Sequence, residues 1–216
     1  MTREGQRAHR LLVGRWHAAA ILVASASAVA VAGLSSAYWH QGSPGRLDLA
    51  LQSALNPLSA TSRDLLDTIV WLGDWRVVTV LTAAIALTAY RSSGARVAAF
   101  SVAATTIAAA TSELMLKPLV DRRLDGDLAF PSGHSTGITA IAMVAVILVV
   151  ALRRPGRAAQ FGLISAASAV MLAVSFALTA LGQHYATDAI GGVLVGVGVV
   201  NVVALGFDMI GDARLS

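Results

Sequence analysis

Long apolar runs alternate with short polar segments along the whole chain. Six windows approach the ~20 apolar residues that a helix rising ~1.5 Å per residue needs to cross a bilayer. They span roughly 17–39, 69–90, 96–116, 132–152, 160–181 and 187–207. The pattern therefore predicts an all-α polytopic membrane protein, with six transmembrane helices in a single bundle and residues 1–216 forming one membrane domain.

The second window is the weakest, because Asp74 and Arg76 lie in its first turns. We predict that these two side chains pair at the membrane interface. Trp71 and Trp75 flank them, and aromatic rings collect at that depth.

Leucines recur at helical spacing between residues 47 and 58, with polar residues between them. This spacing predicts a short amphipathic helix lying on the membrane surface. An ordinary packed helix within the connecting loop is the alternative.

The composition favours a membrane protein over a soluble one: 56% of residues are hydrophobic, 13% are charged, and the mean hydropathy is +0.70. The absence of cysteine excludes disulfides, thiolate nucleophiles and cysteine metal sites. Basic residues lie at the ends of apolar runs rather than in one patch, which argues against a nucleic-acid partner. The preference for Ala, Val, Gly and Arg over Lys indicates GC-rich coding, and hence a bacterial plasma membrane.

The distribution of basic residues predicts the orientation of the chain. The first window is long enough to span the membrane, so we interpret it as an uncleaved span after a cytoplasmic tail, residues 1–15. With that orientation, the cytoplasmic segments hold more basic residues than the opposite side, as the positive-inside rule requires. The cytoplasmic set is Arg3, Arg7, Arg10, Arg15, Arg91, Arg96, Arg153, Arg154, Arg157 and Arg214; the opposite set is Arg46, Arg63, Arg76, Lys117, Arg122 and Arg123.

A polar segment, residues 117–134, separates the third and fourth windows on the predicted outer side. It gathers three basic residues, three aspartates and His134 within a short stretch. Charge is costly beside hydrocarbon, so such a cluster is a candidate functional site. With six spans, the short segment at 181–188 falls on the same side.

Pro-Ser-Gly-His at 131–134 opens the fourth predicted helix. Proline suits the first helical turn, and the free N–H groups there form an anion site. Ser132 can add a hydroxyl donor. The alternative is an ordinary helix start with His134 as an interfacial histidine.

His184 and Asp188 stand four residues apart and share a helix face if the sixth helix begins near Gln183. A carboxylate that binds one imidazole nitrogen leaves the other as a nucleophile or base. A cap at a helix start is the alternative interpretation.

Lys117 is the single lysine of the chain. It follows an apolar helix, where a terminal cation that snorkels to the interface is the simplest explanation. Arg122 and Arg123 are equally compatible with plain surface charge. However, a lysine and an arginine beside a helix N-terminus are also what a phosphate group requires.

Taken together, Lys117 with its following arginines, then Pro-Ser-Gly-His, then His-x3-Asp resemble the type 2 phosphatidic acid phosphatase family of membrane lipid phosphatases. That family is similar in having Lys-x6-Arg-Pro, Pro-Ser-Gly-His and Ser-Arg-x5-His-x3-Asp motifs. The resemblance covers about residues 95–205, the expected catalytic core. The chain departs from the family's pattern at Leu124 and Asp125 in the first motif, and at Ala177 and Leu178 in the third.

The resemblance implies a metal-independent phosphatase without a cofactor. His184 would attack phosphorus and form a phosphohistidine, with Asp188 orienting it. His134 would protonate the departing oxygen and then activate water. The residues implied to hold the phosphate are Lys117, Arg122, Arg123, Ser132 and Gly133. Asp121, Asp125 and Asp127 lack the spacing of a calcium loop.

Two other functions remain open at this stage. The departures at Leu124 and Leu178 are also compatible with a catalytically silent lipid-binding or scaffold protein. Ser132 and His184 would be the dyad of an intramembrane serine protease. The predicted partners are a lipid phosphate and membrane lipids. Gly192 and Gly196 form a small-xxx-small pair, which indicates packing within the chain or, less directly, a homodimer.

Overall fold

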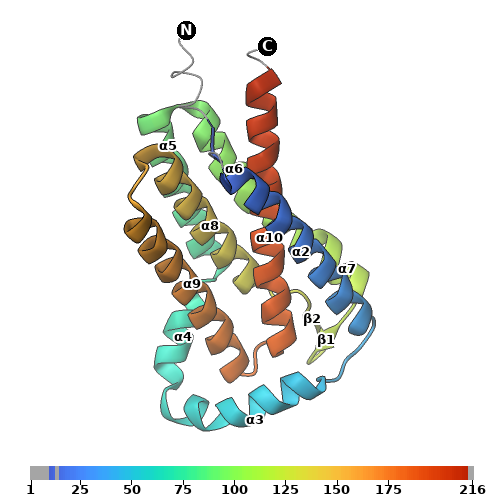
Figure 1. Ribbon diagram of the computed structural model, residues 1–216. Coiled ribbons are helices and arrows are strands. Elements are labelled where there is room, and N and C mark those ends of the chain that lie inside the picture. The colour runs from blue at the N-terminus through green and yellow to red at the C-terminus, as the bar shows by residue number, and fades with distance from the viewer. Residues whose placement is uncertain (1–9, 13–14, 214–216) are drawn as a thin grey trace.

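The computed structural model describes residues 10–12 and 15–213, and it is helical apart from one short hairpin (Figure 1). Most of the predicted cytoplasmic tail lies outside the described residues. The helices before the hairpin are α2 (Arg15–Ala37), α3 (Arg46–Thr61), α4 (Arg63–Trp71), α5 (Trp75–Ser93), α6 (Ala95–Ala110), the π-helical turn η1 (Thr111–Leu116) and α7 (Lys117–Val120). The hairpin consists of β1 (Arg123–Leu124) and β2 (Asp127–Leu128), and it is followed by α8 (Gly133–Arg153), α9 (Arg157–Ala180) and α10 (Ala186–Ala213).

The prediction of a six-span helical bundle is confirmed. Within the described residues, five helices are long and apolar enough to cross a membrane, and α4 with α5 passes the same test as a pair bent by 46°. The five are Trp16–Ala37, Ala95–Val120, Gly133–Arg153, Arg157–Ala180 and Ala186–Gly211. α6, η1 and α7 therefore form one continuous span.

The break between α4 and α5 explains the polar residues of the second window. Asp74 accepts a hydrogen bond from the backbone N–H of Arg76 at 2.9 Å and so caps α5. The Arg76 guanidinium lies over the Trp75 ring, 5.1 Å from its centroid. The predicted Asp74–Arg76 pair is therefore a helix cap rather than an ion pair.

α3 occupies the predicted amphipathic segment and crosses one end of the bundle, beneath α9 and α10 (Figure 1). Leu47, Leu51 and Leu58 remain substantially exposed, whereas Asp48 is 1% exposed. The helix thus turns a carboxylate toward the bundle and leaves leucines outside. That arrangement suits a helix at a membrane surface.

α10 lies at the centre of the bundle, between α2, α8 and α6 (Figure 1). Gly192 and Gly196 bring it close to α8: a Cβ at Gly192 would lie 2.8 Å from Ser135 Cβ, and one at Gly196 would lie 2.7 Å from Thr139 Cβ. The small-xxx-small pair is used within the chain. A dimer through the same surface would have to displace α8.

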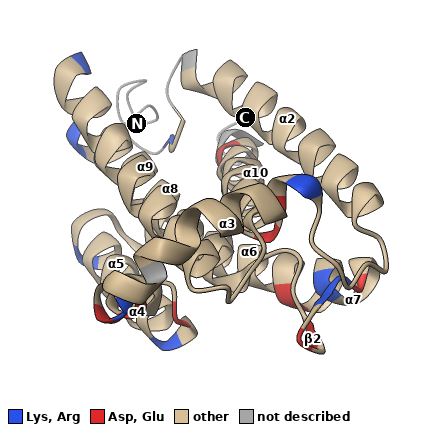
Figure 2. Ribbon diagram, turned by 90° about the horizontal axis from the view of Figure 1, so that it is seen from below, with Lys and Arg blue, Asp and Glu red and all other residues tan. Residues whose placement is uncertain are grey.

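The first residues of α2 and the last turns of α10 lie at the same end of the bundle (Figure 1). α3, α4 and the β1–β2 hairpin lie at the opposite end. Viewed from that end, charged residues are seen on α4, α7 and β2 and around the rim of the bundle (Figure 2). The polar segments that the sequence predicts to form a functional site therefore lie at one end of the molecule.

Candidate active site

A cavity of about 560 Å³ opens at the end of the bundle that carries α3. Its walls come from five parts of the chain: α5 (Trp75, Val78), α6 with η1 and α7 (Ala109, Glu113, Lys117), the hairpin (Asp125, Asp127), α8 (Gly133, His134, Gly137) and the turn before α10 (Gly182, His184). The lining includes charged and polar side chains as well as apolar ones.

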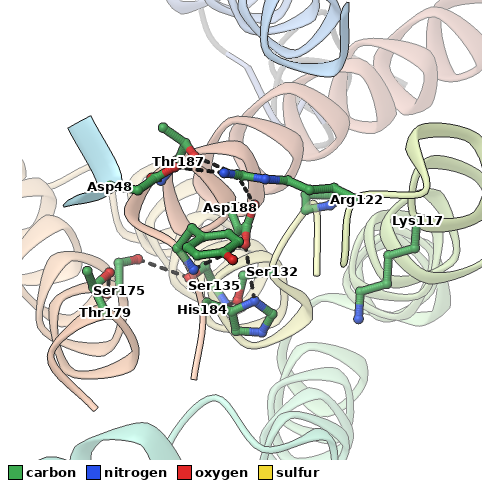
Figure 3. Close-up of polar contacts among 12 residues, drawn as sticks. Asp48, Lys117, Arg122, Ser132, Ser135, Ser175, Thr179, His184, Thr187 and Asp188 are labelled. Carbon is green, nitrogen blue, oxygen red and sulfur yellow. Dashed lines mark hydrogen bonds and ion pairs between the residues drawn. The ribbon is translucent and has the colours of Figure 1, made fainter. Parts of the chain in front are cut away.

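His184 lies in the turn before α10, and its side chain is 14% exposed. Its Nδ1 is 3.8 Å from Oδ2 of Asp188, which is fully buried (Figure 3). The same Oδ2 accepts a hydrogen bond from the Tyr185 N–H at 3.1 Å. Among the described residues, Nδ1 of His184 has no hydrogen-bond partner. The two predicted residues are adjacent, therefore, with a gap slightly longer than a hydrogen bond.

His134 stands in the first turn of α8 and lines the same cavity as His184. Gly73, in the break between α4 and α5, packs directly against it: a Cβ at residue 73 would lie 2.9 Å from His134 Cβ. The bend between α4 and α5 thus packs against one of the two histidines. Two imidazoles from separate helix starts share one cavity.

Lys117 reaches the cavity, but it is already paired. Its Nζ lies 2.8 Å from Oε2 of Glu113, one helical turn earlier. Oε1 of Glu113 occupies the position that a side chain at Gly133 would need, so the carboxylate sits over the start of α8. Sequence reasoning missed Glu113, although a lone acid inside an apolar window was the available signal. It lies in η1, and π-helical turns are frequent at functional sites.

Arg122 is not where the phosphate-binding prediction requires it. Its side chain is fully buried, and it is not among the described residues that line the cavity. Its Nη1 donates to Asp188 Oδ1 at 2.5 Å and to Thr187 Oγ1 at 2.6 Å, and its Nη2 donates to Asp48 Oδ2 at 2.7 Å (Figure 3). The guanidinium is committed to two carboxylates because both are buried beside it.

Arg123 and Ser132 also lie outside the described cavity wall. Arg123 is exposed and binds Asp121 at 2.7 Å and the Gly126 carbonyl at 2.9 Å, which shapes the hairpin. Ser132 is fully buried, and its Oγ accepts a hydrogen bond from the Ser135 N–H as the cap of α8. These two residues stabilise the loop and the helix start.

Leu178, where the resembled family has an arginine, is fully buried in an apolar cluster with Leu66 and Val70. Neither Arg122 nor Arg123 enters that space. Among the described residues that line the cavity, Lys117 is the one that carries a permanent positive charge. Glu113, Asp125 and Asp127 line the same cavity, so the cavity is less cationic than the sequence suggests.

Comparisons with known proteins agree with the motif pattern. A protein-family model described as the PAP2 superfamily matches residues 18–211, which is most of the chain. No curated protein and no solved structure matches it.

Proposed function

Because the chain belongs to the PAP2 superfamily, whose members are phosphatases acting on lipid-type substrates, we propose that it hydrolyses a lipid phosphate or lipid diphosphate through a phosphohistidine. The observation that carries the proposal is the cavity shared by His134 and His184. The apolar side chains of Trp75, Val78 and Ala109 also line this cavity, which suits the first carbons of a lipid tail.

In the proposed first step, Nε2 of His184 attacks phosphorus. Nδ1 faces Asp188, which leaves Nε2 for the substrate. A P–N bond forms while the P–O bond to the lipid breaks, and His134 protonates the departing oxygen. His134 then takes a proton from water, whose oxygen attacks phosphorus, and the P–N bond breaks to release phosphate. A small movement that closes the 3.8 Å gap would let Asp188 stabilise the imidazolium of His184.

Lys117 and the backbone N–H of Gly133 would hold the phosphoryl oxygens. Lys117 lines the cavity with 16% of its side chain exposed, and Gly133 begins α8. A helix N-terminus favours an anion, because its first N–H groups have no helical partner. To engage phosphate, Lys117 exchanges its bond with Glu113 for one with the substrate.

The proposed location is a bacterial plasma membrane, with the cavity at the outer face and the N-terminus in the cytoplasm. Support comes from the excess of basic residues in the sequence segments predicted to be cytoplasmic. Trp75, which lines the cavity, and Trp71, at the end of α4, are both exposed, and this is consistent with an interfacial depth.

The first prediction concerns turnover. Purified protein should release phosphate from at least one member of a panel of lipid phosphates and diphosphates in chelator-treated buffer, and vanadate should inhibit it. His184→Ala should lose this release by about a thousandfold or more, because the nucleophile is gone. His134→Ala should lose it to a smaller degree, by about a hundredfold or more.

His17→Ala is the matched control, since His17 lies on α2 rather than at the cavity. Full turnover by His184→Ala would overturn the mechanism. Binding of the panel lipids without release of phosphate would favour the silent lipid-binding alternative, for which the apolar surroundings of Leu178 are the specific observation. A fluorophosphonate that labels Ser132 would support the serine protease instead.

A further inference from the structure

We propose that Asp48 and Arg122 are positioning residues that set the charge and orientation of the Asp188–His184 pair. The inference rests on the proposed role of His184 as the nucleophile. It connects α3, the amphipathic helix, to the reacting histidine through Arg122 and Asp188.

Arg122 is held by two aromatic rings and by carboxylates at both terminal nitrogens, although its buried Nε has no hydrogen-bond partner among the described residues. Its Cζ lies 3.8 Å from the centroid of the Tyr38 ring and 4.4 Å from the centroid of the Tyr185 ring. Its terminal nitrogens bind Asp48 and Asp188. A planar guanidinium that is stacked on aromatic rings and held by a carboxylate at each terminal nitrogen has little freedom to turn toward a substrate.

Asp48 is equally well held. Its Oδ1 accepts from the N–H of Thr187 at 2.9 Å and from the Thr187 hydroxyl at 2.8 Å. Its Oδ2 accepts from the Gly45 N–H and from Arg122. Burial raises the pKa of Asp48, but the hydrogen bonds from Thr187, Gly45 and Arg122 outweigh it and hold the pKa below its ordinary value. The carboxylate is therefore ionised at neutral pH.

The net charge of the buried group formed by Asp48, Arg122 and Asp188 is the basis of its proposed effect on His184. One arginine between Asp48 and Asp188 leaves the group with a net charge of minus one. Arg122 binds Oδ1 of Asp188, so Oδ2 remains directed toward His184. Asp48 balances Arg122, and the charge of Asp188 is left to stabilise the imidazolium that forms when His184 attacks phosphorus. Without Asp48, Arg122 would neutralise Asp188.

Opposite charge changes should therefore move the His184 pKa in opposite directions. In Asp48→Asn, the pKa of His184 should fall by about half a pH unit or more, because Arg122 then cancels Asp188. In Arg122→Gln it should rise by a similar amount, because no cation then balances the charges of Asp48 and Asp188. The double variant Asp48→Asn/Arg122→Gln should return it toward the wild-type value.

The measurement is an NMR titration of histidine-labelled protein in detergent micelles, with the His184 resonance assigned by comparison with His184→Gln. The other charged or titratable groups around the cavity are His134, Lys117, Glu113, Asp125 and Asp127, and all are unchanged in these variants. Asp64→Asn, an exposed aspartate on α4, is the matched control and should leave the pKa unaltered.

Equal His184 pKa values in Asp48→Asn and Asp64→Asn, or shifts of the same sign in Asp48→Asn and Arg122→Gln, would overturn the proposal. If either buried variant does not fold, Arg122→Lys tests the same arrangement: it keeps the charge but loses the double hydrogen bond. It should leave the His184 pKa near the wild-type value and lower kcat about tenfold with little change in KM. An unchanged kcat would count against positioning.

The titration does not depend on turnover. If the wild type proves inactive, the proposed function fails, while the pKa shifts still decide whether Asp48 and Arg122 act on His184.

Discussion

At the scale of single residues, Glu113 is the residue that most alters the predicted phosphate-binding arrangement. Its carboxylate pairs with Lys117 and covers Gly133, the two groups proposed to bind phosphate. It thus occupies the place of an anion at the start of α8. If Lys117 and Gly133 bind phosphate as proposed, the substrate has to displace this carboxylate, and we expect Glu113 to weaken phosphate binding.

Replacing Glu113 with Gln should strengthen phosphate binding. The change removes a negative charge from the cavity and frees Lys117, so the inhibition constant for inorganic phosphate should fall about two- to fivefold, the size expected of a partly exposed ion pair. The measurement is competitive inhibition of lipid phosphate hydrolysis. Weaker inhibition in the variant would show that Glu113 helps to hold the ligand.

Asp67→Asn is the matched control for this experiment. It also removes the acid of an i,i+4 pair, Arg63 with Asp67, but on the exposed face of α4. Phosphate inhibition should be unchanged there.

At the scale of elements, the break between α4 and α5 decides where His134 stands. The chain bends by 46° there, Asp74 caps α5, and Gly73 packs on His134. The sequence marks the interruption through Asp74 and Arg76. It contains no sign that the bend closes against the histidine of another helix, because that contact joins residues distant in the chain.

Gly73→Ala should therefore impair turnover more than folding. The new methyl group would lie 3.1 Å from the His134 carbonyl and closer still to its Cβ, so α8 or the α4–α5 break must shift. Displacing a catalytic group by part of an ångström is expected to lower kcat about tenfold or more. The measurement is kcat beside thermal unfolding in detergent.

Gly162→Ala on α9 is the control, since nothing lies within 4 Å of a Cβ at that residue. It should keep full turnover and gain slightly in stability, as alanine favours the helix. Equal kcat in the two variants would mean that the contact between Gly73 and His134 does not set the position of His134.

At the scale of the whole molecule, α10 joins the turn that carries His184 to the rest of the bundle. It carries Asp188 at its start, and Gly192 and Gly196 allow close contact with α8, which carries His134. The two histidines keep their relation because these two helices pack closely at the cavity end. Stability and geometry of the site therefore depend on the same contact.

Gly196→Ala should destabilise the protein, because a Cβ there would lie 2.7 Å from Thr139 Cβ. Overpacking of this kind costs about 1–3 kcal/mol. Thermal unfolding in detergent should show a lower midpoint. Gly206→Ala on the same helix, where a Cβ meets nothing within 4 Å, should show no loss. Equal midpoints would mean that α8 and α10 separate easily.

The sequence by itself determined the spans, the order of the motifs and the family. Span formation depends on the length and polarity of a continuous stretch, and motifs depend on local spacing, so both can be recognised without knowing the fold. The predictions for Gly133, His134 and His184 concern two helix starts, which local sequence can mark for the same reason.

Only the tertiary structure decided the partners of the charged side chains. Arg122 meets Asp48 and Asp188, which lie 74 and 66 residues away, and this removes it from the cavity. Leu178 lies in an apolar cluster with Leu66 and Val70, so no cation is needed there. The position of a buried charge depends on which opposite charges the fold brings beside it, and local sequence does not contain that information.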